Sequence, residues 1–484
     1  MSDQSIIFLG VAIYVVLMLA VGAYASKKTH TAAEFIVAGR NMPVFLCTAT
    51  IIATWFGGGT MMGVSGSAYD DGLLGVIADP FGATLALFLI GLFFARFMRR
   101  LRLLTYVEIV DHRFGKTAAT ITTLATVVSN IGWLGAMLVA FALVFQSLTD
   151  TPLLVGVIGG AVIVVIYTMI GGLWAVALTD FLQICIIIVG IVVLFIVVLI
   201  DVGGWSNISP QLPENAFRLV PMEHTAEQWL NYLRMWLIFG LADIPSQTLL
   251  GRALAAKSER TAQNSFYLSA VGYLLFAMIP VTLGIIASVT MPDLAESEAV
   301  IPTLAIEHLH PVAVAVFVGA ILAAIMSTCD SSLLSVASLV SRNLLPLVKP
   351  DASDKLMLTV ARLTIPVVGI VGIVIALKAR AVYDVIVDAN ILALTATTVP
   401  FFLSIWWKKA TRTGALAAML TGFATWLITR AVAPEMPGDL FGLAVCLVTI
   451  VVVSLLTQKS DPPRPARDVD GNEVELTNRL GVLR

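Results

Sequence analysis

Long apolar runs, separated by short polar or charged stretches, follow one another along almost the whole chain. A helix that crosses a bilayer needs about 20 mostly apolar residues, and hydrophobicity on that scale is the main signal for such helices. The runs predict about thirteen spans, which make the chain an all-α polytopic membrane protein. The predicted spans are 5–25, 43–69, 72–97, 117–148, 152–172, 176–201, 227–253, 262–290, 311–344, 355–377, 382–407, 412–432 and 439–457.

The composition agrees with this prediction. Hydrophobic residues make up 58% of the chain and charged residues 12%, against roughly 45–50% and 25% in soluble domains. We expect one transmembrane domain over residues 1–457 and a disordered tail over 458–484, because the tail is charged and proline-rich. The four cysteines fall inside apolar runs without metal-binding spacing, so we expect free thiols.

The basic residues are distributed unevenly between the two sides of the predicted spans. Most of the 29 lysines and arginines, Arg252 among them, fall on one side; the other side receives Arg218, Arg234, Lys378, Arg380 and Arg430. Basic loops mark the cytoplasmic side. We expect the protein to lie in the cell membrane (inner or plasma membrane). An odd number of spans then predicts that the N-terminus lies outside and the C-terminus in the cytoplasm.

One predicted span carries an unusual polar run, Ser327-Thr328-Cys329-Asp330-Ser331-Ser332. Unpaired polar groups in hydrocarbon cost several kcal/mol each, so this run should face the inside of a bundle. Ser327, Asp330 and Ser331 are spaced to share one helical face. Hydroxyls and carboxylates are hard oxygen ligands that suit a hard cation such as Na⁺. The alternative is a face that packs against other helices, where Ser and Thr are common.

Two other predicted spans contain residues that interrupt helices. Ala53–Thr60 reads ATWFGGGT, and its three glycines favour an unwound segment with free backbone groups; close packing through small residues is the alternative. Gly240–Gln247 reads GLADIPSQ, where Pro245 breaks the helix beside the mid-span carboxylate of Asp243. Two interrupted helices five spans apart indicate an inverted repeat with substrate bound between the breaks.

These stretches resemble the sodium:solute symporter family. The matching motifs are A-T-W-x-G-G-G, G-G-L-x-x-V-x-x-T-D-x-x-Q at Gly171–Gln183, and A-x-x-M-S-T-x-D-S-S-L-L-S at Ala323–Ser335. The resemblance implies a 5+5 inverted-repeat core, with repeats at about 43–201 and 227–407 and with broken first and sixth core helices. It implies one Na⁺ site formed by Ala53, Phe56, Ala324, Ser327 and Thr328. It implies a second cation near Asp180, Asp330 and Ser331, although Asp180 read alone also fits a helix N-cap.

Within that family the chain is most similar to the high-affinity choline transporter-like branch. Trp55 and Trp133 match two tryptophans that help to cage a quaternary ammonium there, and ordinary core packing is the alternative for both. Ser246 stands where that cage has a further tryptophan, and Ala83 where it has a tyrosine. Asp243 and Asp79 add carboxylates instead, which fits a smaller amine. The implied substrate-binding residues are Trp55, Thr60, Trp133, Asp243, Ser246 and Gln247.

The function predicted is Na⁺-coupled secondary active transport of a small organic solute: an amine, an amino acid or a choline-like cation. Uptake of a sugar or a carboxylate is the alternative substrate class, and a channel or a transporter-like sensor is the alternative protein class. The sequence presents no nucleophile–base constellation or metal-ligand cluster typical of an enzyme. We expect Na⁺ (one or two ions), a small-molecule substrate and the lipid bilayer as partners, and no nucleic acid; the oligomeric state stays open.

Overall fold

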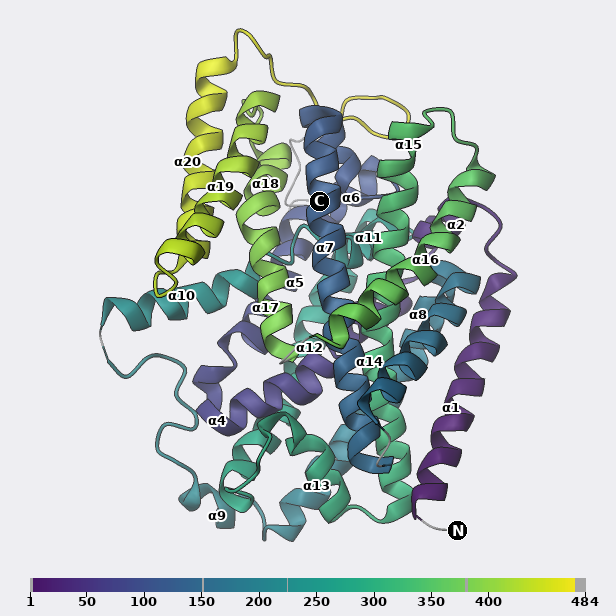
Figure 1. The fold of residues 1–484 in the computed structure, drawn as a ribbon, viewed down its shortest axis with the longest axis vertical. Coiled ribbons are helices and arrows are strands. Elements are labelled where there is room, and N and C mark those ends of the chain that lie inside the picture. Colours follow the sequence, from purple (N-terminus) through teal and green to yellow (C-terminus); the bar gives the residue numbers. More distant parts are fainter. Residues whose placement is uncertain (1–2, 150–151, 224, 379–381, 475–484) are drawn as a thin grey trace.

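The computed structural model describes residues 3–149, 152–223, 225–378 and 382–474. These residues form helices connected by short loops (Figure 1), and their only β-type pairings are two isolated bridges, Met42 with Ala256 and Arg467 with Glu473. The α-helices are α1 (Asp3–Ser26), α2 (Ala32–Val37), α3 (Val44–Trp55), α4 (Ser65–Gly75), α5 (Ala83–Leu89), α6 (Ala95–Leu101), α7 (Val107–Thr149), α8 (Leu153–Asp201), α9 (Trp205–Ile208), α10 (Ala226–Gly240), α11 (Gln247–Ala255), α12 (Glu259–Thr290), α13 (Val300–His308), α14 (Pro311–Leu339), α15 (Leu345–Val348), α16 (Asp354–Ala376), α17 (Val382–Ala393), α18 (Val399–Trp406), α19 (Arg412–Val432) and α20 (Gly438–Thr457). Tighter or wider helical turns join several of them: η1 (Ala38–Arg40), η2 (Gly59–Val64), η3 (Ile77–Gly82), η4 (Ile90–Phe94), η5 (Ser209–Gln211), η6 (Ser297–Ala299), η7 (Val340–Leu344) and η8 (Leu394–Thr398).

The all-α polytopic fold class is confirmed, and each predicted span coincides with helix. Among the described residues, nine helices are long and apolar enough to cross a membrane, and the bent pair of α3 with η2 and α4 makes ten. The count of thirteen stays a prediction, because α10 and α11 are each too short to span a membrane alone.

The longest helix, α8, is two spans joined at a glycine. Its 49 residues would extend roughly 70 Å if straight, more than twice the roughly 30 Å of a bilayer core. Gly172 divides it with φ 54° and ψ −151°, a conformation that other residues rarely adopt. A Cβ at this position would lie 2.7 Å from the carbonyl oxygen of Phe35. The turn therefore needs glycine, and it separates the predicted spans 152–172 and 176–201.

Both predicted interruptions are present. The axis bends by 55° between α3 and the helix that starts at Gly59. The second interruption is Leu241–Ser246, between α10 and α11, where Pro245 has no N–H to continue the helix. Ser246 then caps α11 by accepting a hydrogen bond from the Leu249 N–H at 3.3 Å. The breaks lie five spans apart, as an inverted-repeat core requires.

The helix with the polar run, α14, lies at the centre of the bundle. It packs against α1, α7, α8 and α16, and Figure 1 shows it running lengthwise among them. Every residue from Phe317 to Leu339 is buried, so the polar run faces protein on all sides. Cys329, on this helix, is a free thiol, as are Cys47, Cys185 and Cys446.

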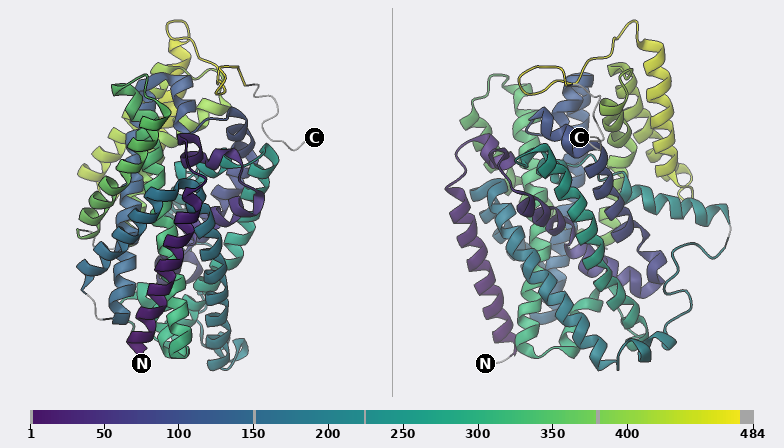
Figure 2. Two further views of the ribbon diagram at one scale, coloured as in Figure 1. Left: turned by 90° about the vertical axis from the view of Figure 1, so that its right-hand side faces the viewer. Right: turned by 180° about the vertical axis from the view of Figure 1, so that it is seen from behind.

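The start of α1 and the end of α20 lie at opposite ends of the elongated molecule (Figures 1 and 2). Beyond α20, residues 458–474 of the predicted tail form turns and irregular segments that contact the basic end of the bundle. Val469 N–H donates to the Leu101 carbonyl at 3.1 Å, and Arg102 pairs with Asp470 at 3.0 Å. His112 contacts the Arg467 carbonyl at 3.0 Å. Residues 475–484 lie outside the described residues.

Candidate functional site

The break in α3 lies directly against α14. A Cβ on Gly57 would lie 2.2 Å from Thr328 Oγ1 and 3.3 Å from the Ala324 carbonyl oxygen, so only glycine allows this approach. The N–H of Gly57 donates to Trp55 O at 2.7 Å rather than continuing the helical pattern to Ala53. Phe56 has ψ 60°, which turns its carbonyl away from the helix direction. The break thus places Gly57 against Thr328 and the Ala324 carbonyl, two of the predicted Na⁺ ligands.

The two hydroxyls of the predicted Na⁺ site both have acceptors for their protons. Ser327 Oγ donates to Asp180 Oδ1 at 2.5 Å. Thr328 Oγ1 donates to the carbonyl of Thr54 at 2.9 Å. Each hydroxyl has one proton and two lone pairs, so both oxygens keep electron density for a cation.

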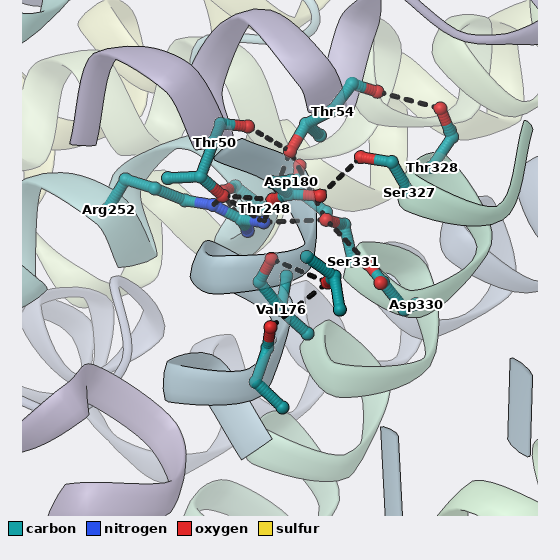
Figure 3. Close-up of polar contacts among 12 residues, drawn as sticks. Thr50, Thr54, Val176, Asp180, Thr248, Arg252, Ser327, Thr328, Asp330 and Ser331 are labelled. Carbon is teal, nitrogen blue, oxygen red and sulfur yellow. Dashed lines mark hydrogen bonds and ion pairs between the residues drawn. The ribbon is translucent and has the colours of Figure 1, made fainter. Parts of the chain in front are cut away.

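Asp180 connects three helices from inside the membrane-spanning part of the bundle. It lies within α8, eight residues after the Gly172 turn, so the N-cap alternative is wrong. Its side chain is fully buried and accepts hydrogen bonds from Ser327 and from Thr50 of α3. Asp180 therefore holds α3 and α14 together at the break (Figure 3).

Arg252, which the sequence analysis places among the basic residues of the cytoplasmic side, is instead buried next to Asp180 and completes this cluster. Arg252 of α11 is only 3% exposed. Its Nη2 lies 3.9 Å from Asp180 Oδ2, and it donates to Ser331 Oγ at 2.5 Å and to Thr54 Oγ1 at 3.1 Å. Figure 3 shows the guanidinium entering the cluster from α11. An arginine within the predicted span 227–253 was the signal that could have revealed it.

Asp330 is the second carboxylate of the cluster, and it is fully buried on α14. Tyr167 of α8 donates to its Oδ2 at 2.7 Å, and Ser331 donates to its Oδ1 at 3.3 Å. The structure thus places Asp180, Asp330 and Ser331 in one buried network, which also contains Arg252.

A small cavity of about 40 Å³ lies next to the α3 break. It is lined from both broken helices and from α7, α14 and α17, and its walls include four of the six predicted substrate residues. Its walls include Thr54, Trp55, Thr126, Ser129, Asn130, Trp133, Ala242, Asp243, Pro245, Ser246, Thr248, Thr328, Ser332 and Ala393. We call it the central cavity. Thr328 belongs both to this lining and to the predicted Na⁺ site.

Asp243 faces the central cavity, and it has no cationic partner among the described residues. Its Oδ2 accepts from Asn390 Nδ2 at 3.1 Å, and Asn390 Oδ1 accepts from Trp133 Nε1 at 3.0 Å. Across the parts of the chain that the structure describes, no Lys, Arg or His lies within ion-pair distance of Asp243. Asn390 was not predicted; an amide in the middle of a span was its signal.

Thr60 lies outside the central cavity, in a network with a third buried carboxylate. Its hydroxyl contacts Tyr273 Oη at 2.8 Å and Asp79 Oδ2 at 3.4 Å, and Tyr273 donates to Asp79 Oδ1 at 2.5 Å. Asp79 lines a separate space of about 10 Å³ that shares Trp55 and Trp133 with the central cavity. The two tryptophans therefore stand between Asp79 and Asp243.

Gln247 lies away from the central cavity. Its Oε1 accepts from the Tyr106 N–H at 3.0 Å, and its Nε2 donates to the Leu104 carbonyl at 3.3 Å. The oxygen and the nitrogen of this side-chain amide thus both attach the start of α11 to the segment before α7. The structure gives Gln247 a structural position rather than a place in the cavity wall.

The cluster and the cavity combine the features of an ion-coupled carrier, and comparisons with known proteins agree. Residues 35–422 match the model of the sodium:solute symporter family. The high-affinity choline transporter 1 of Drosophila melanogaster is 29% identical over 436 residues, which cover 86% of this chain and 69% of that protein. The sodium/pantothenate symporter of Escherichia coli (strain K12) is 27% identical over 441 residues, 86% of this chain and 89% of that protein.

The fold is also that of a solved symporter. The substrate-bound outward-open structure of a Na⁺-coupled sialic acid symporter superposes with a TM-score of 0.82 at 20% sequence identity, over 95% of this chain and 99% of that one. The family model covers most of the sequence, and the proteins matched are transporters and not enzymes. The chain therefore belongs to the sodium:solute symporter family, and it is a Na⁺-coupled membrane transporter of a small solute.

Proposed function

We propose that this symporter takes up a small organic amine, with Na⁺ held where the α3 break meets α14 and the amine held in the central cavity. Thr328 is the observation that carries this proposal. Its hydroxyl lies at the junction of α3 and α14, and its side chain also lines the cavity that contains Asp243. If bound Na⁺ fixes the position of Thr328, it also fixes part of the cavity wall that contacts the substrate.

The proposed Na⁺ ligands are the carbonyls of Ala53, Phe56 and Ala324 and the hydroxyls of Ser327 and Thr328. The directions of the two hydroxyl protons support this choice. Ser327 donates to Asp180, and Thr328 donates to Thr54 O at 2.9 Å with the Ala324 carbonyl further away at 3.5 Å, so both hydroxyl oxygens keep lone pairs for a cation. Oxygen donors of this kind suit a hard cation, and the Asp180 carboxylate adds negative charge behind Ser327.

The proposed partner of the substrate nitrogen is Asp243. A carboxylate inside a membrane protein is expensive unless it is paired, hydrated or protonated. The faces of Trp55 and Trp133 share the cavity with it, and an aromatic face attracts a desolvated cation by roughly 2 kcal/mol. A substrate ammonium would supply the positively charged partner that the described residues do not give Asp243.

The size of the central cavity supports a small substrate. A volume of about 40 Å³ compares with the ~10–15 Å³ that one water needs on this measure. An amine of few heavy atoms needs little rearrangement to enter, whereas a trimethylammonium group needs the walls to move apart. Ser246 and Thr248 offer hydroxyls to an amine that can donate hydrogen bonds.

One finer assignment, the orientation in the membrane, belongs to the same proposal, and two points stay open beside it. The molecule lies in the cell membrane with the basic end, which contains the end of α20, in the cytoplasm and the N-terminus outside. A further cation near Asp180, Asp330 and Ser331 is a separate prediction of the resemblance. The competing role for Asp243 is a proton site, kept neutral by burial.

The experiment that tests the substrate class combines binding and transport. The purified protein is screened by thermal shift with ethanolamine, choline, proline, glucose and pantothenate, each with Na⁺ and with K⁺. We expect stabilisation by an amine that is larger in Na⁺ than in K⁺, and counter-flow of that amine in proteoliposomes. Stabilisation by glucose or pantothenate alone would contradict the amine assignment. Absence of counter-flow for the compound that binds would contradict a carrier.

A further inference from the structure

We propose that the guanidinium of Arg252 takes the place of a second Na⁺, so that this transporter binds one Na⁺ and Arg252 sets that number. The inference rests on the proposed Na⁺ site at Ser327 and Thr328, and its experiment separates the two. Arg252 is not one of the predicted ion ligands.

Arg252 already occupies the oxygens that a cation beside Asp180 would need. Nη2 donates to Ser331 Oγ at 2.5 Å and to Thr54 Oγ1 at 3.1 Å, and it lies 3.9 Å from Asp180 Oδ2. Nε and Nη2 both lie 3.4 Å from Thr50 Oγ1. Two cations at contact distance from one carboxylate repel each other strongly in a buried site. A second Na⁺ and the guanidinium therefore exclude one another here.

The position of the guanidinium is fixed by the fold. Arg252 lies in the last turn of α11, the short helix that starts after the Leu241–Ser246 break. Its Nη1 donates to the carbonyl of Thr248, one turn earlier on the same helix, at 2.6 Å. The side chain is 3% exposed, so it is held inside the bundle and does not reach water. An arginine buried in this way keeps its charge and needs negative partners.

Formal charges in the cluster balance with one Na⁺ and not with two. Asp180 and Asp330 contribute two negative charges, and Arg252 contributes one positive charge. One Na⁺ on Ser327, whose hydroxyl touches Asp180 at 2.5 Å, brings the sum to zero. A further Na⁺ would leave one uncompensated positive charge in a buried region, which is strongly unfavourable. Without the guanidinium, the two carboxylates would balance two Na⁺ ions.

The test counts the bound Na⁺ ions on purified protein by equilibrium binding of ²²Na⁺, without measuring transport. We expect one Na⁺ per chain in the wild type, two in Arg252→Gln, and one again in Arg252→Lys, which restores the positive charge. Arg100→Gln is the matched control, because it removes an arginine from a surface ion pair with Glu259. It should leave the count at one. A count of two in the wild type, or of one in Arg252→Gln, would overturn the proposal.

A double-mutant cycle keeps the proposal testable where Arg252→Gln does not fold. Asp180→Asn leaves the cluster neutral before Na⁺ binds, so it should weaken Na⁺ binding at least about tenfold. Adding Arg252→Gln restores one negative charge and should recover most of that affinity. If the double variant binds Na⁺ no better than Asp180→Asn, Arg252 has a structural role and the proposal fails.

A different result would refute the proposed Na⁺ site itself. Ser327→Ala with Thr328→Ala should remove the single Na⁺ of the wild type, and it should reduce the count in Arg252→Gln from two to one. A wild-type background that keeps its Na⁺ after both alanine substitutions would refute the site at the α3 break, whatever the count in Arg252→Gln.

Discussion

The hydroxyl protons of Ser327 and Thr328 decide which way their lone pairs face. Because these protons go to Asp180 and to the Thr54 carbonyl, the oxygens are left as acceptors beside the α3 break. Neither residue is needed to satisfy the helix to which it belongs. At the scale of single residues, the proposed Na⁺ site thus contains two hydroxyls whose own hydrogen bonds leave lone pairs for a cation.

Ser327→Ala and Thr328→Ala should each raise the Na⁺ concentration for half-maximal uptake roughly tenfold or more, because each removes one ligand of a charged group worth ~1.5–3 kcal/mol. Na⁺-dependent uptake into proteoliposomes measures this. Ser338→Ala is the matched control on α14, since its buried hydroxyl only donates to Leu334 O of the same helix at 2.6 Å. Equal Na⁺ dependence in the double alanine variant and in this control would refute the assignment.

Asp243→Asn should weaken amine binding at least about tenfold while leaving Na⁺ binding nearly unchanged, because it removes the charge that faces the substrate nitrogen. Isothermal titration of the amine at several pH values measures the amine affinity and its pH dependence. Asp70→Asn, at an exposed carboxylate on α4, is the control. If the variant instead loses pH dependence with its amine affinity intact, Asp243 carries a proton and does not pair with substrate.

Among the helices, the α3 break is the element on which the site depends most. The glycines at 57–59 let α3 end at Trp55, and the absence of a side chain at Gly57 lets Thr328 approach. The sequence predicts this break well, because three consecutive glycines in the middle of a span disfavour a continuous helix. It also predicts the α10–α11 break, through Pro245.

Gly57→Ala should therefore abolish the Na⁺ dependence of binding while the protein still folds. Its Cβ would lie 2.2 Å from Thr328 Oγ1, and relief of such an overlap typically costs ~1–3 kcal/mol. Na⁺-dependent thermal stability measures the effect. Gly159→Ala on α8 is the control, because a Cβ there has no neighbour within 4 Å among the described residues. Wild-type Na⁺ stabilisation in Gly57→Ala would show that the break does not form the site.

Sequence patterns predict helices better than they predict contacts between them. Apolar runs place the spans because length and hydropathy are properties of one segment at a time. Arg252 and Asn390 were missed because their roles depend on partners in distant helices, Asp180 and Asp243. Gln247 was assigned to the cavity because it adjoins the break, whereas its direction depends on the Tyr106 and Leu104 backbone. The resemblance could supply ion ligands, but it could not supply these contacts.

Across the whole molecule, the ion site and the central cavity are parts of one structure formed by α3, α7, α11 and α14. Thr54 and Thr328 line the central cavity, and both also belong to the polar cluster. Binding of Na⁺ should order these residues and thereby raise the affinity of the cavity for substrate. By linkage, bound substrate must raise the affinity for Na⁺ by the same factor.

The measurement that tests this account most directly is the affinity for the amine in Na⁺ and in K⁺, on the same purified protein. We predict that Na⁺ lowers the Kd by roughly 5–150-fold, the usual range of coupling between two sites, and that Ser327→Ala with Thr328→Ala removes the difference. The same Kd in Na⁺ and in K⁺ for the wild type, or a full Na⁺ effect in the double variant, would contradict the coupling of these two sites through the α3–α14 junction.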